Sequence, residues 1–238
     1  MSLLEEIKKI NNFIDIFTPS VRGNIKFKPL NLKQQREILD NLELSATAII
    51  KFFNNTKKII ENSILEDPDT PEINVTLTVI DRPNILIGLR NNIDSNYNNF
   101  NLKKLLEKNA TLKNIPDTNK KFITKDLIIE CTIPDLDTDY KVNKFLIENT
   151  KDDKALIGKL YVNEVVKFIK SISFKDNEDN KTLFNEIDTK EAFDIVENIQ
   201  SLNLKDVYEY IKEVRAFERE LVTLTKKQVD IGPELFVL

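Results

Sequence analysis

The chain has 238 residues, of which 31% are charged and 41% hydrophobic, and its formal net charge at pH 7 is −4. It contains no His, no Trp, one Cys and four Gly. The lack of His removes the side chain most used for acid–base catalysis and metal binding. The scarcity of Gly disfavours loops that close around phosphate groups. Composition therefore favours a folded, helix-rich protein that binds other molecules, and it disfavours an enzyme.

Charge and cysteine content narrow the set of partners and cofactors. The 35 basic residues are interspersed with 39 acidic ones, so no basic stripe indicates nucleic acid as a partner. A single Cys forms no internal disulfide and no structural zinc site, and Cys131 is expected to be a buried hydrophobe. No apolar run approaches the about 20 residues of a membrane helix, and residues 1–10 lack the apolar core of a signal peptide. We therefore expect no cofactor, no metal, no membrane contact and no small-molecule substrate.

Periodicity in the first third of the chain predicts mainly helices. The pattern predicts helices over residues 3–17, 32–39 and 44–64 and a strand over residues 25–30. Ser2 and Glu5 form a capping-box pattern at the start of the first helix. Asn31 is a suitable N-cap for the second helix, and Pro29 restricts the end of the strand to a sheet edge.

The middle of the chain mixes clear and weak signals. Alternation over 75–79 predicts a strand. Asp81 followed by Pro83 predicts the start of a short helix that ends near Asn92. One continuous helix over 74–92 is the alternative, against which Pro83 argues. Residues 91–125 are polar and rich in Asn and Lys, with a short helix predicted over 101–108.

The remainder of the chain returns to strong apolar patterns. A polar turn is predicted over 176–180, and Thr189 is a candidate helix cap. The tail over 229–238 is apolar, so it either docks in the core or is presented to a partner. The pattern predicts a strand over 127–133 and helices over 139–148, 157–174, 190–200 and 204–221.

These elements together predict a helix-dominated α+β fold, in which amphipathic helices pack with a small sheet of short strands. The strands expected in that sheet are residues 25–30, 75–80 and 127–133. The chain divides into a helical N-terminal half (1–93), a polar insertion or connection (94–121), and a strand-plus-helical C-terminal half (122–238). We do not expect the two halves to fold independently.

Asp and Glu are the only side chains suited to catalysis that the sequence contains in quantity. They are densest at residues 66–69 and at Asp135, Asp137 and Asp139. The second cluster is similar to a calcium loop, but it lacks the central Gly and the distal Glu, so a solvated loop is the favoured interpretation. A hydrolase that uses only carboxylates is the least favoured function, because no carboxylate pair stands out at a strand end.

Asp81, Arg82 and Arg90 form a second charged group, placed between apolar runs. The favoured interpretation is a helix cap with arginines that pair with carboxylates. The alternative is an ion-pair cluster at a contact between subunits.

Several segments, taken in chain order, resemble the baseplate hub assembly protein family of T4-like contractile-tailed bacteriophages. Residues 77–90 are the most distinctive, since they are similar to the family's pattern of an apolar pair, Asp, a short apolar helix and a Leu-Arg ending. Many relatives carry Cys pairs after that ending, whereas residues 91–125 here contain no Cys, so no metal role is implied. The similar segments are residues 27–30 with 33–39, 45–64, 77–90, 127–134, 160–172, 201–204 with the helix after them, and the C-terminal aromatic.

The resemblance implies a non-enzymatic virion morphogenesis protein, either a structural subunit or an assembly factor of the phage tail baseplate hub. It implies partners among the other tail or baseplate proteins, or a second copy of the chain. The expected location is the virion, at the tail baseplate, or the host cytoplasm during assembly. A small helical adaptor or regulatory protein that binds a partner helix is the alternative. The candidate interaction residues, which are the family-signature positions, are Phe27, Pro29, Asp81, Arg82, Arg90 and Phe236.

Overall fold

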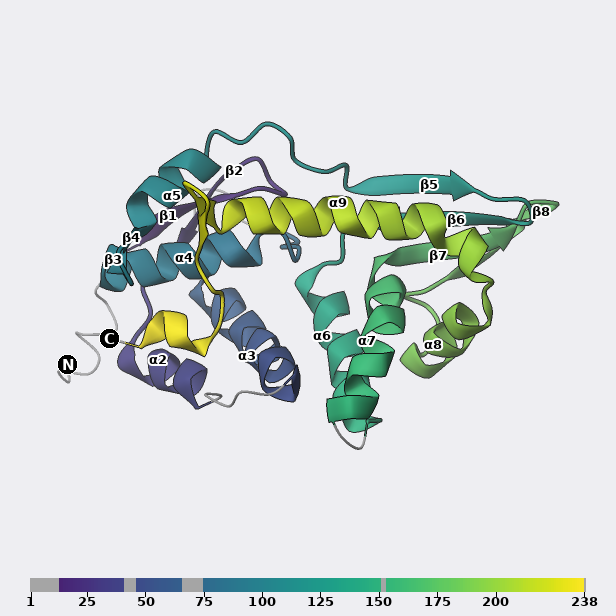
Figure 1. Cartoon of the computed structure of the whole chain (residues 1–238), viewed down its shortest axis with the longest axis horizontal. Coiled ribbons are helices and arrows are strands. Elements are labelled where there is room, and N and C mark those ends of the chain that lie inside the picture. The colour runs from purple at the N-terminus through teal and green to yellow at the C-terminus, as the bar shows by residue number, and fades with distance from the viewer. Residues whose placement is uncertain (1–12, 41–45, 66–74, 151–152, 238) are drawn as a thin grey trace.

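A computed structural model describes residues 13–40, 46–65, 75–150 and 153–237. The described residues form eight α-helices and small antiparallel sheets of short strands, which confirms the predicted helix-dominated α+β class. The molecule is elongated (Figure 1). Two groups of elements lie side by side along its long axis, and α9 (Lys205–Leu221) runs along one side of both (Figure 1).

The first group surrounds a hydrophobic cluster that we call the N-terminal core, which includes Phe27, Phe52 and Phe236. The chain returns to this group at its end, where the 3-10 helix η2 (Pro233–Phe236) lies beside α2. The elements of the group are β1 (Ile14–Thr18), β2 (Gly23–Phe27), α2 (Leu32–Leu39), α3 (Ala46–Ser63), α4 (Arg82–Ile93), β3 (Asn96–Tyr97), β4 (Phe100–Asn101) and α5 (Leu102–Asn109).

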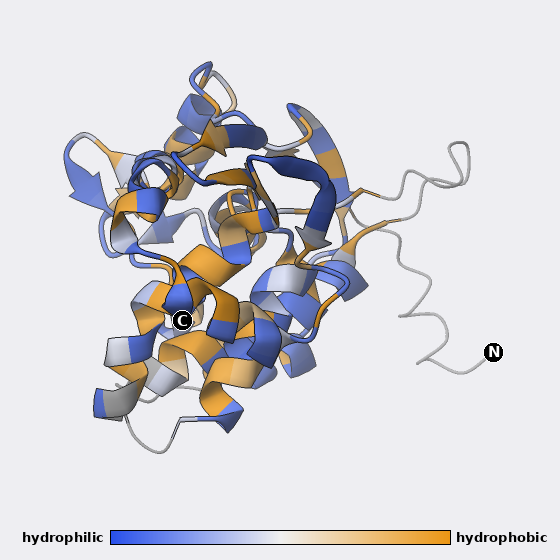
Figure 2. Ribbon diagram, turned by 90° about the vertical axis from the view of Figure 1, so that its right-hand side faces the viewer, coloured by the Kyte–Doolittle hydropathy of each residue, from blue (hydrophilic) through white to orange (hydrophobic). Residues whose placement is uncertain are grey.

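The second group is built on a four-stranded antiparallel sheet in the order β5-β6-β7-β8. Its hydrophobic cluster, which we call the sheet core, includes Ile129, Phe168 and Tyr210. Figure 2 views this end of the molecule and shows hydrophobic residues concentrated in the helices, while hydrophilic residues dominate much of the outer strand and loop surface. The elements are β5 (Asn119–Ile123), β6 (Leu127–Thr132), α6 (Leu136–Glu148), α7 (Asp153–Phe168), β7 (Ile169–Phe174), β8 (Asn177–Leu183), α8 (Thr189–Asn198) and η1 (Ser201–Leu204).

Helix α9 connects the two cores. Tyr210 contacts the sheet through Phe122, with ring centroids 6.3 Å apart. Leu221, at the end of the helix, is still part of the sheet core, whereas the next residue, Val222, packs against the N-terminal core. After α9 the chain forms a small hairpin, β9 (Thr223–Leu224) with β10 (Lys227–Gln228), and continues to η2.

Helix α4 lies at the centre of the first group. All nine residues from Arg82 to Arg90 are buried, as expected for a helix that packs on every side. Pro83 lies in its first turn, so the helix begins where the sequence predicted, and a continuous helix over 74–92 is wrong. The strand predicted over 75–79 is also wrong, because only Thr78 forms an isolated bridge, with Asp135.

The helix predicted over 3–17 is wrong for its described end, since Ile14–Thr18 is strand β1; residues 1–12 lie outside the described residues. Ile14 and Ile16 pair with Phe27 and Ile25 of β2 in an antiparallel hairpin. The apolar residues at 13, 14 and 17 fit a helical period, but the β-branched alternation of Ile14, Ile16 and Thr18 fits a strand equally well. Pairing with β2 decides between the two.

The helix predicted over 157–174 is half right. Helix α7 ends at Phe168, and the chain continues without a loop into β7. Residues 165–172 are nearly all buried, and the apolar positions 165, 166, 168, 169 and 172 fit a helix, so this short segment does not by itself distinguish a helix from a central strand. The turn predicted over 176–180 is mostly strand β8, whose polar residues are typical of a protected sheet edge.

The other predicted elements are present with shifted ends. Asn31 caps α2 in a full capping box with Gln34. Helix α8 is capped by Asp188 instead of Thr189. Strand β2 ends at Phe27, short of the predicted residue 30. Residues 94–121 are divided between the groups, because α5 belongs to the first group and β5 begins the sheet of the second.

Candidate functional site

A cavity of about 590 Å³ opens between the two groups of elements, below α9. Helices α3, α6, α7 and α9 supply most of its wall, and residues 228–231, from the end of β10 onward, close one side. The wall combines apolar residues such as Ile49 and Phe53 with a dense set of charged side chains. Cavities at the junction of two structural units are common ligand sites, so this cavity is the first candidate.

The charged side chains of the cavity form a continuous chain of alternating sign, which we call the charge network. Arg82 of α4 lies at one end, where its Nη2 donates a hydrogen bond to Asp139 Oδ2 of α6 at 2.5 Å. The other oxygen of Asp139, Oδ1, lies 2.9 Å from Lys167 Nζ. The side chains of all three residues are at most 7% exposed.

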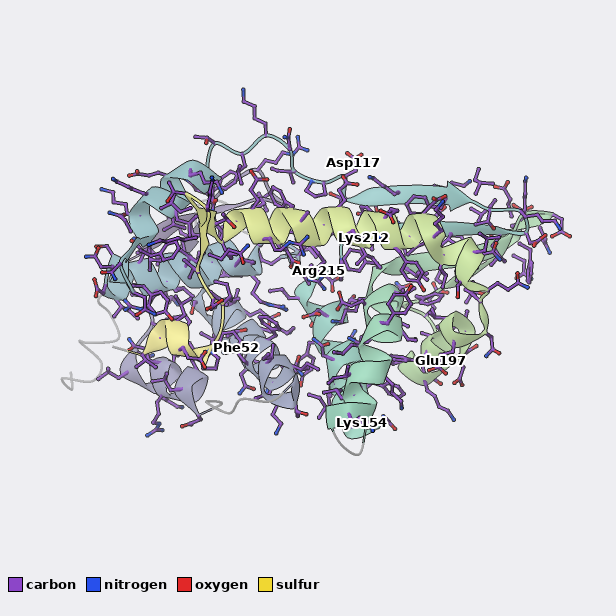
Figure 3. All side chains as sticks on the ribbon, viewed as in Figure 1. Phe52, Asp117, Lys154, Glu197, Lys212 and Arg215 are labelled. Carbon is purple, nitrogen blue, oxygen red and sulfur yellow. The ribbon has the colours of Figure 1, made fainter. Side chains whose placement is uncertain are left out.

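The charge network continues from α7 to α9 through Glu164. Lys167 Nζ lies 2.9 Å from Glu164 Oε1, and Arg215 Nε donates to Glu164 Oε2 at 2.9 Å. Arg215 also donates through Nη1 to Glu218 Oε2 at 2.5 Å. Figure 3 shows Arg215 on the side of α9 that faces the space between the two groups. One network thus joins α4, α6, α7 and α9.

Local sequence places these side chains. Asp139 lies in the first turn of α6, where a carboxylate is favoured by the positive end of the helix. Glu164 and Lys167 are three residues apart on α7, as are Arg215 and Glu218 on α9, so each pair shares a helix face. Two aromatic rings support the arginines, since Arg82 lies 4.8 Å from the centroid of Phe53 and Arg215 lies 5.8 Å from that of Phe168.

The charge network keeps its carboxylates ionised. Burial alone would raise the pKa of Asp139, but the charges of Lys167 and Arg82 outweigh it and lower that pKa well below its usual range. Burial likewise opposes ionisation of Glu164, and Lys167 and Arg215 lower its pKa to about 2. A general base works best when its pKa is near the working pH. Neither carboxylate therefore suits proton transfer at neutral pH.

Cys131 does not supply a nucleophile to this cavity. The side chain is fully buried in the sheet core, as expected from the sequence, and burial raises the pKa of its thiol to about 12. The reactive form of a cysteine is the thiolate, which this environment strongly disfavours. The residues that line the cavity suit the joining of four helices, and they do not form an acid–base or nucleophilic pair.

Two buried atoms of the charge network region have no hydrogen-bond partner among the described residues, namely Arg82 Nε and Asn163 Oδ1. Asn163 donates through Nδ2 to Asn143 Oδ1 at 3.2 Å. An unpaired buried polar atom lowers stability by about 1–3 kcal/mol. Both atoms are covered by protein and do not face the open part of the cavity, so they mark no ligand position there.

The three aspartates predicted as a solvated loop are instead on or next to the first turn of α6, each with a separate task. Asp135 caps the helix by accepting from Thr138 N at 2.6 Å. Asp137 pairs with Lys57 of α3 at 2.9 Å, and Asp139 belongs to the charge network. Among the described residues, no group of three or more His, Cys, Asp or Glu is placed to hold a metal ion. The acidic residues at 66–69 lie outside the described residues.

The carboxylate of Asp81 does not cap α4 as the sequence predicted, but binds Ser20 and Thr78. It occupies the N-cap position of α4, but its carboxylate makes no capping hydrogen bond. It accepts instead from Ser20 N at 2.8 Å, Ser20 Oγ at 2.6 Å and Thr78 N at 2.8 Å. Asp81 thereby fixes the turn of the β1–β2 hairpin against the start of α4.

Arg90 holds the C-terminal segment. Its Nε donates to the carbonyl oxygen of Leu235 at 2.7 Å, and its Nη1 donates to that of Asp94 at 2.9 Å. Phe236 next to it is 1% exposed in the N-terminal core. The apolar tail therefore docks in the core, which was one of the two alternatives open from the sequence.

The six candidate interaction residues are thus mostly internal. Phe27, Asp81, Arg82, Arg90 and Phe236 are buried, and Pro29 is half-buried. The structure brings Arg82 to the charge network and Arg90 to Phe236, and it leaves Phe27 and Pro29 at the β2 end of the N-terminal core. The sequence analysis missed Glu164, Lys167, Arg215 and Glu218. Their signal was the pairing of opposite charges three residues apart on the amphipathic helices α7 and α9.

Comparisons of the chain with protein-family models, with curated proteins and with solved structures found no match. None of the helices in the described part of the chain is long and apolar enough to cross a membrane.

Proposed function

We propose that the protein is a non-enzymatic virion morphogenesis protein of a contractile-tailed phage, which acts as a structural subunit or assembly factor of the tail baseplate hub. The observation that carries this proposal is the ordered series of segments from Phe27 to the C-terminal aromatic that resembles the hub assembly family. Its sharpest segment, residues 77–90, includes the nine buried residues of α4, the helix at the centre of the first group of elements.

The chemistry of the cavity supports a role without catalysis. Two of its carboxylates, Asp139 and Glu164, are each held between two cations and stay ionised. The ion pairs in this cavity link four helices and so fix their arrangement. A fixed arrangement of helices is suited to recognition by other proteins.

Exposed apolar side chains support a role in assembly. Ile157 is 62% exposed and Leu202 80% exposed, although each lies on a well-formed helix. Apolar surface that the chain does not cover itself is typical of protein contact sites when it is clustered. We expect the partners to be other tail or baseplate proteins or a second copy of the chain, in the virion or in the host cytoplasm during assembly.

The decisive experiment is a phage that carries an early stop codon in this gene, with a wild-type copy supplied in trans as the control. We expect tails without baseplates in electron micrographs, and recovery of complete particles with the control. Normal numbers of complete baseplates without the protein would overturn the proposal. Mass spectrometry of purified virions then separates the two roles, since a subunit is retained and an assembly factor is absent.

A second candidate function is a helical adaptor or regulatory protein that binds a partner helix. An apolar groove between α7 and α9 favours it, because grooves between helices accept amphipathic helices. The neighbouring genes distinguish the candidates, since tail genes on both sides are expected only for the hub protein. An adaptor of the host would also leave baseplate assembly intact in the stop-codon phage.

A further inference from the structure

Helices α7 and α9 form a surface hollow whose lining is mainly apolar. It has a volume of about 500 Å³, and we call it the α7–α9 groove. Its apolar lining comes from both helices, and it adjoins the cavity described above because Leu160, Glu164 and Arg215 line both. The residues that give it an apolar lining are Ile157, Leu160, Tyr161, Val165, Tyr208 and Ile211.

Part of the apolar lining is exposed, and its two tyrosines contact each other. Ile157 is 62% and Tyr161 58% exposed. The ring centroids of Tyr161 on α7 and Tyr208 on α9 lie 4.5 Å apart, so the two helices contact each other through this pair. A partly exposed tyrosine pair beside an aliphatic side chain is a typical anchor site at protein interfaces.

One lysine, Lys212, lines the groove, and two further lysines lie one helical turn from residues that line it. On α9, Lys205, Tyr208 and Lys212 recur at spacings of three and four residues, so they share one face of the helix. On α7, Lys154 lies three residues before Ile157 and therefore on the same face. Figure 3 shows Lys212 on α9 and Lys154 near the first turn of α7, at the far end from α9.

These cations are largely available to a partner. Within the described parts of the chain, Lys154 and Lys205 form no ion pair. Lys212 pairs only with Glu209, and both side chains of that pair are more than 60% exposed, so water screens it. The carboxylate that lines the groove, Glu164, is already engaged by Lys167 and Arg215. The groove thus combines an apolar lining with Lys212 in its wall and with Lys154 and Lys205 one helical turn from lining residues, partly offset by the exposed Glu209.

We propose that the α7–α9 groove binds an acidic amphipathic helix of a partner protein. The apolar stripe of that helix, spaced i, i+3, i+4 and i+7, would lie on Ile157, Tyr161 and Tyr208. Its carboxylates would lie toward the three lysines. This inference rests on the assembly function proposed above and adds the chemistry of the partner to it.

The chemistry of the groove favours this partner over a small anion and over a second copy of the chain. A small anion would not use the apolar lining, which makes up most of the groove. A second copy of the chain offers helix α8 as an acidic element, with exposed carboxylates at Glu191, Asp194 and Glu197. That helix turns its apolar residues, such as Phe193, into its own core, so it has no free apolar stripe to offer.

The test uses the full chain and two fluorescein-labelled helical peptides with the same apolar stripe, one with Glu and one with Lys at the remaining positions. Fluorescence anisotropy measures the Kd of each. We expect the acidic peptide to bind at least about tenfold more tightly, and its affinity to fall with added salt as charge attraction is screened. We expect Tyr161→Ala and Ile157→Asp each to weaken it by about tenfold or more.

Two further variants make the test specific. Ile123→Asp changes a side chain that is 60% exposed on β5, outside the groove, and should leave the Kd unchanged. The double change Lys154→Glu with Lys205→Glu should reverse the preference, so that the basic peptide binds more tightly. Circular dichroism of each variant confirms that it remains folded.

Equal binding of both peptides, no measurable binding, or an equal loss with Ile123→Asp would overturn the groove assignment. Those results would leave the hub function standing, because the stop-codon phage tests that separately. Normal baseplates without the protein, together with tight and charge-dependent peptide binding, would leave the groove standing and overturn the hub function.

Discussion

At the scale of single residues, Asp139 is the carboxylate of the charge network that two buried cations share. It is the shared partner of Arg82 and Lys167, both of them buried. A buried ion pair adds little net stability, because desolvation offsets the attraction, but removal of one partner leaves a buried charge unpaired. Asp139 therefore contributes to stability mainly by compensating the charge of the two buried cations.

We expect Asp139→Asn to lower the free energy of unfolding by about 3–5 kcal/mol, since two buried cations lose their charge partner at almost constant side-chain volume. Urea denaturation at pH 7 measures the change. Asp137→Asn, two residues earlier, is the matched control. Its side chain is 65% exposed and pairs with Lys57, so it should cost no more than about 1 kcal/mol. Equal losses for the two variants would contradict the assignment.

The same carboxylates predict how stability depends on pH. The folded-state pKa values of Asp139 and Glu164 lie below the values of about 3.9 and 4.3 for unfolded chains, with that of Glu164 at about 2. The unfolded state therefore binds more protons in this range, and stability falls as the pH falls. We expect the free energy of unfolding to decrease from about pH 5 toward pH 2, as measured by urea titrations.

The control for that pH dependence is the variant already described. The difference in stability between the wild type and Asp139→Asn should be full at pH 5 and should shrink as the pH approaches 2. A difference that stays constant across this range would show that Asp139 is not held ionised by its neighbours.

At the scale of elements, the contact of α4 with β1 depends on a glycine. A Cβ added at Gly88 would lie 2.6 Å from Cδ1 of Ile16, which is itself buried against the helix. We expect Gly88→Ala to lower the free energy of unfolding by about 1–3 kcal/mol, because the overpacked side chain must shift. Gly158→Ala on α7 is the control, since nothing lies within 4 Å of its Cβ. There, alanine should raise stability by up to about 1 kcal/mol. Destabilisation by both changes would contradict this account.

Local patterns predicted the elements whose signal is contained in a few neighbouring residues. Asn31 and Gln34 mark the start of α2 by a capping box, and Pro83 marks the start of α4. Elements that depend on distant pairing were missed. Strand β7 follows α7 without a break in its buried apolar positions and becomes a strand because β6 pairs with it.

The charge network could not be predicted from the sequence for a related reason. Its members come from α4, α6, α7 and α9, and nothing in the spacing of Arg82 and Asp139 along the chain indicates that they meet. The sequence did indicate that Arg82 would pair with a carboxylate. Which carboxylate it meets depends on the packing of α4 against α6, which is a property of the folded chain.

At the scale of the whole molecule, the chain crosses between its two cores several times. α9 belongs to the sheet core and leads into the segment that ends in the N-terminal core, and the charge network joins helices of both groups. Unfolding one core would expose the apolar faces and unpaired charges that the other core uses. The two cores should therefore unfold together, in one cooperative transition.

That cooperativity is measurable with one truncation in each core. Phe236→Ala removes a ring that is 1% exposed in the N-terminal core, and Val214→Ala removes two methyl groups from a fully buried site in the sheet core. We expect losses of about 3–5 kcal/mol for the phenylalanine and a smaller loss for the valine, from the cavities created. Each variant should shift a single urea transition, with far-ultraviolet circular dichroism and tyrosine fluorescence changing together. If Phe236→Ala instead split the curve into two steps while Val214→Ala moved only one of them, the two cores would be separate folding units and α9 a linker between them.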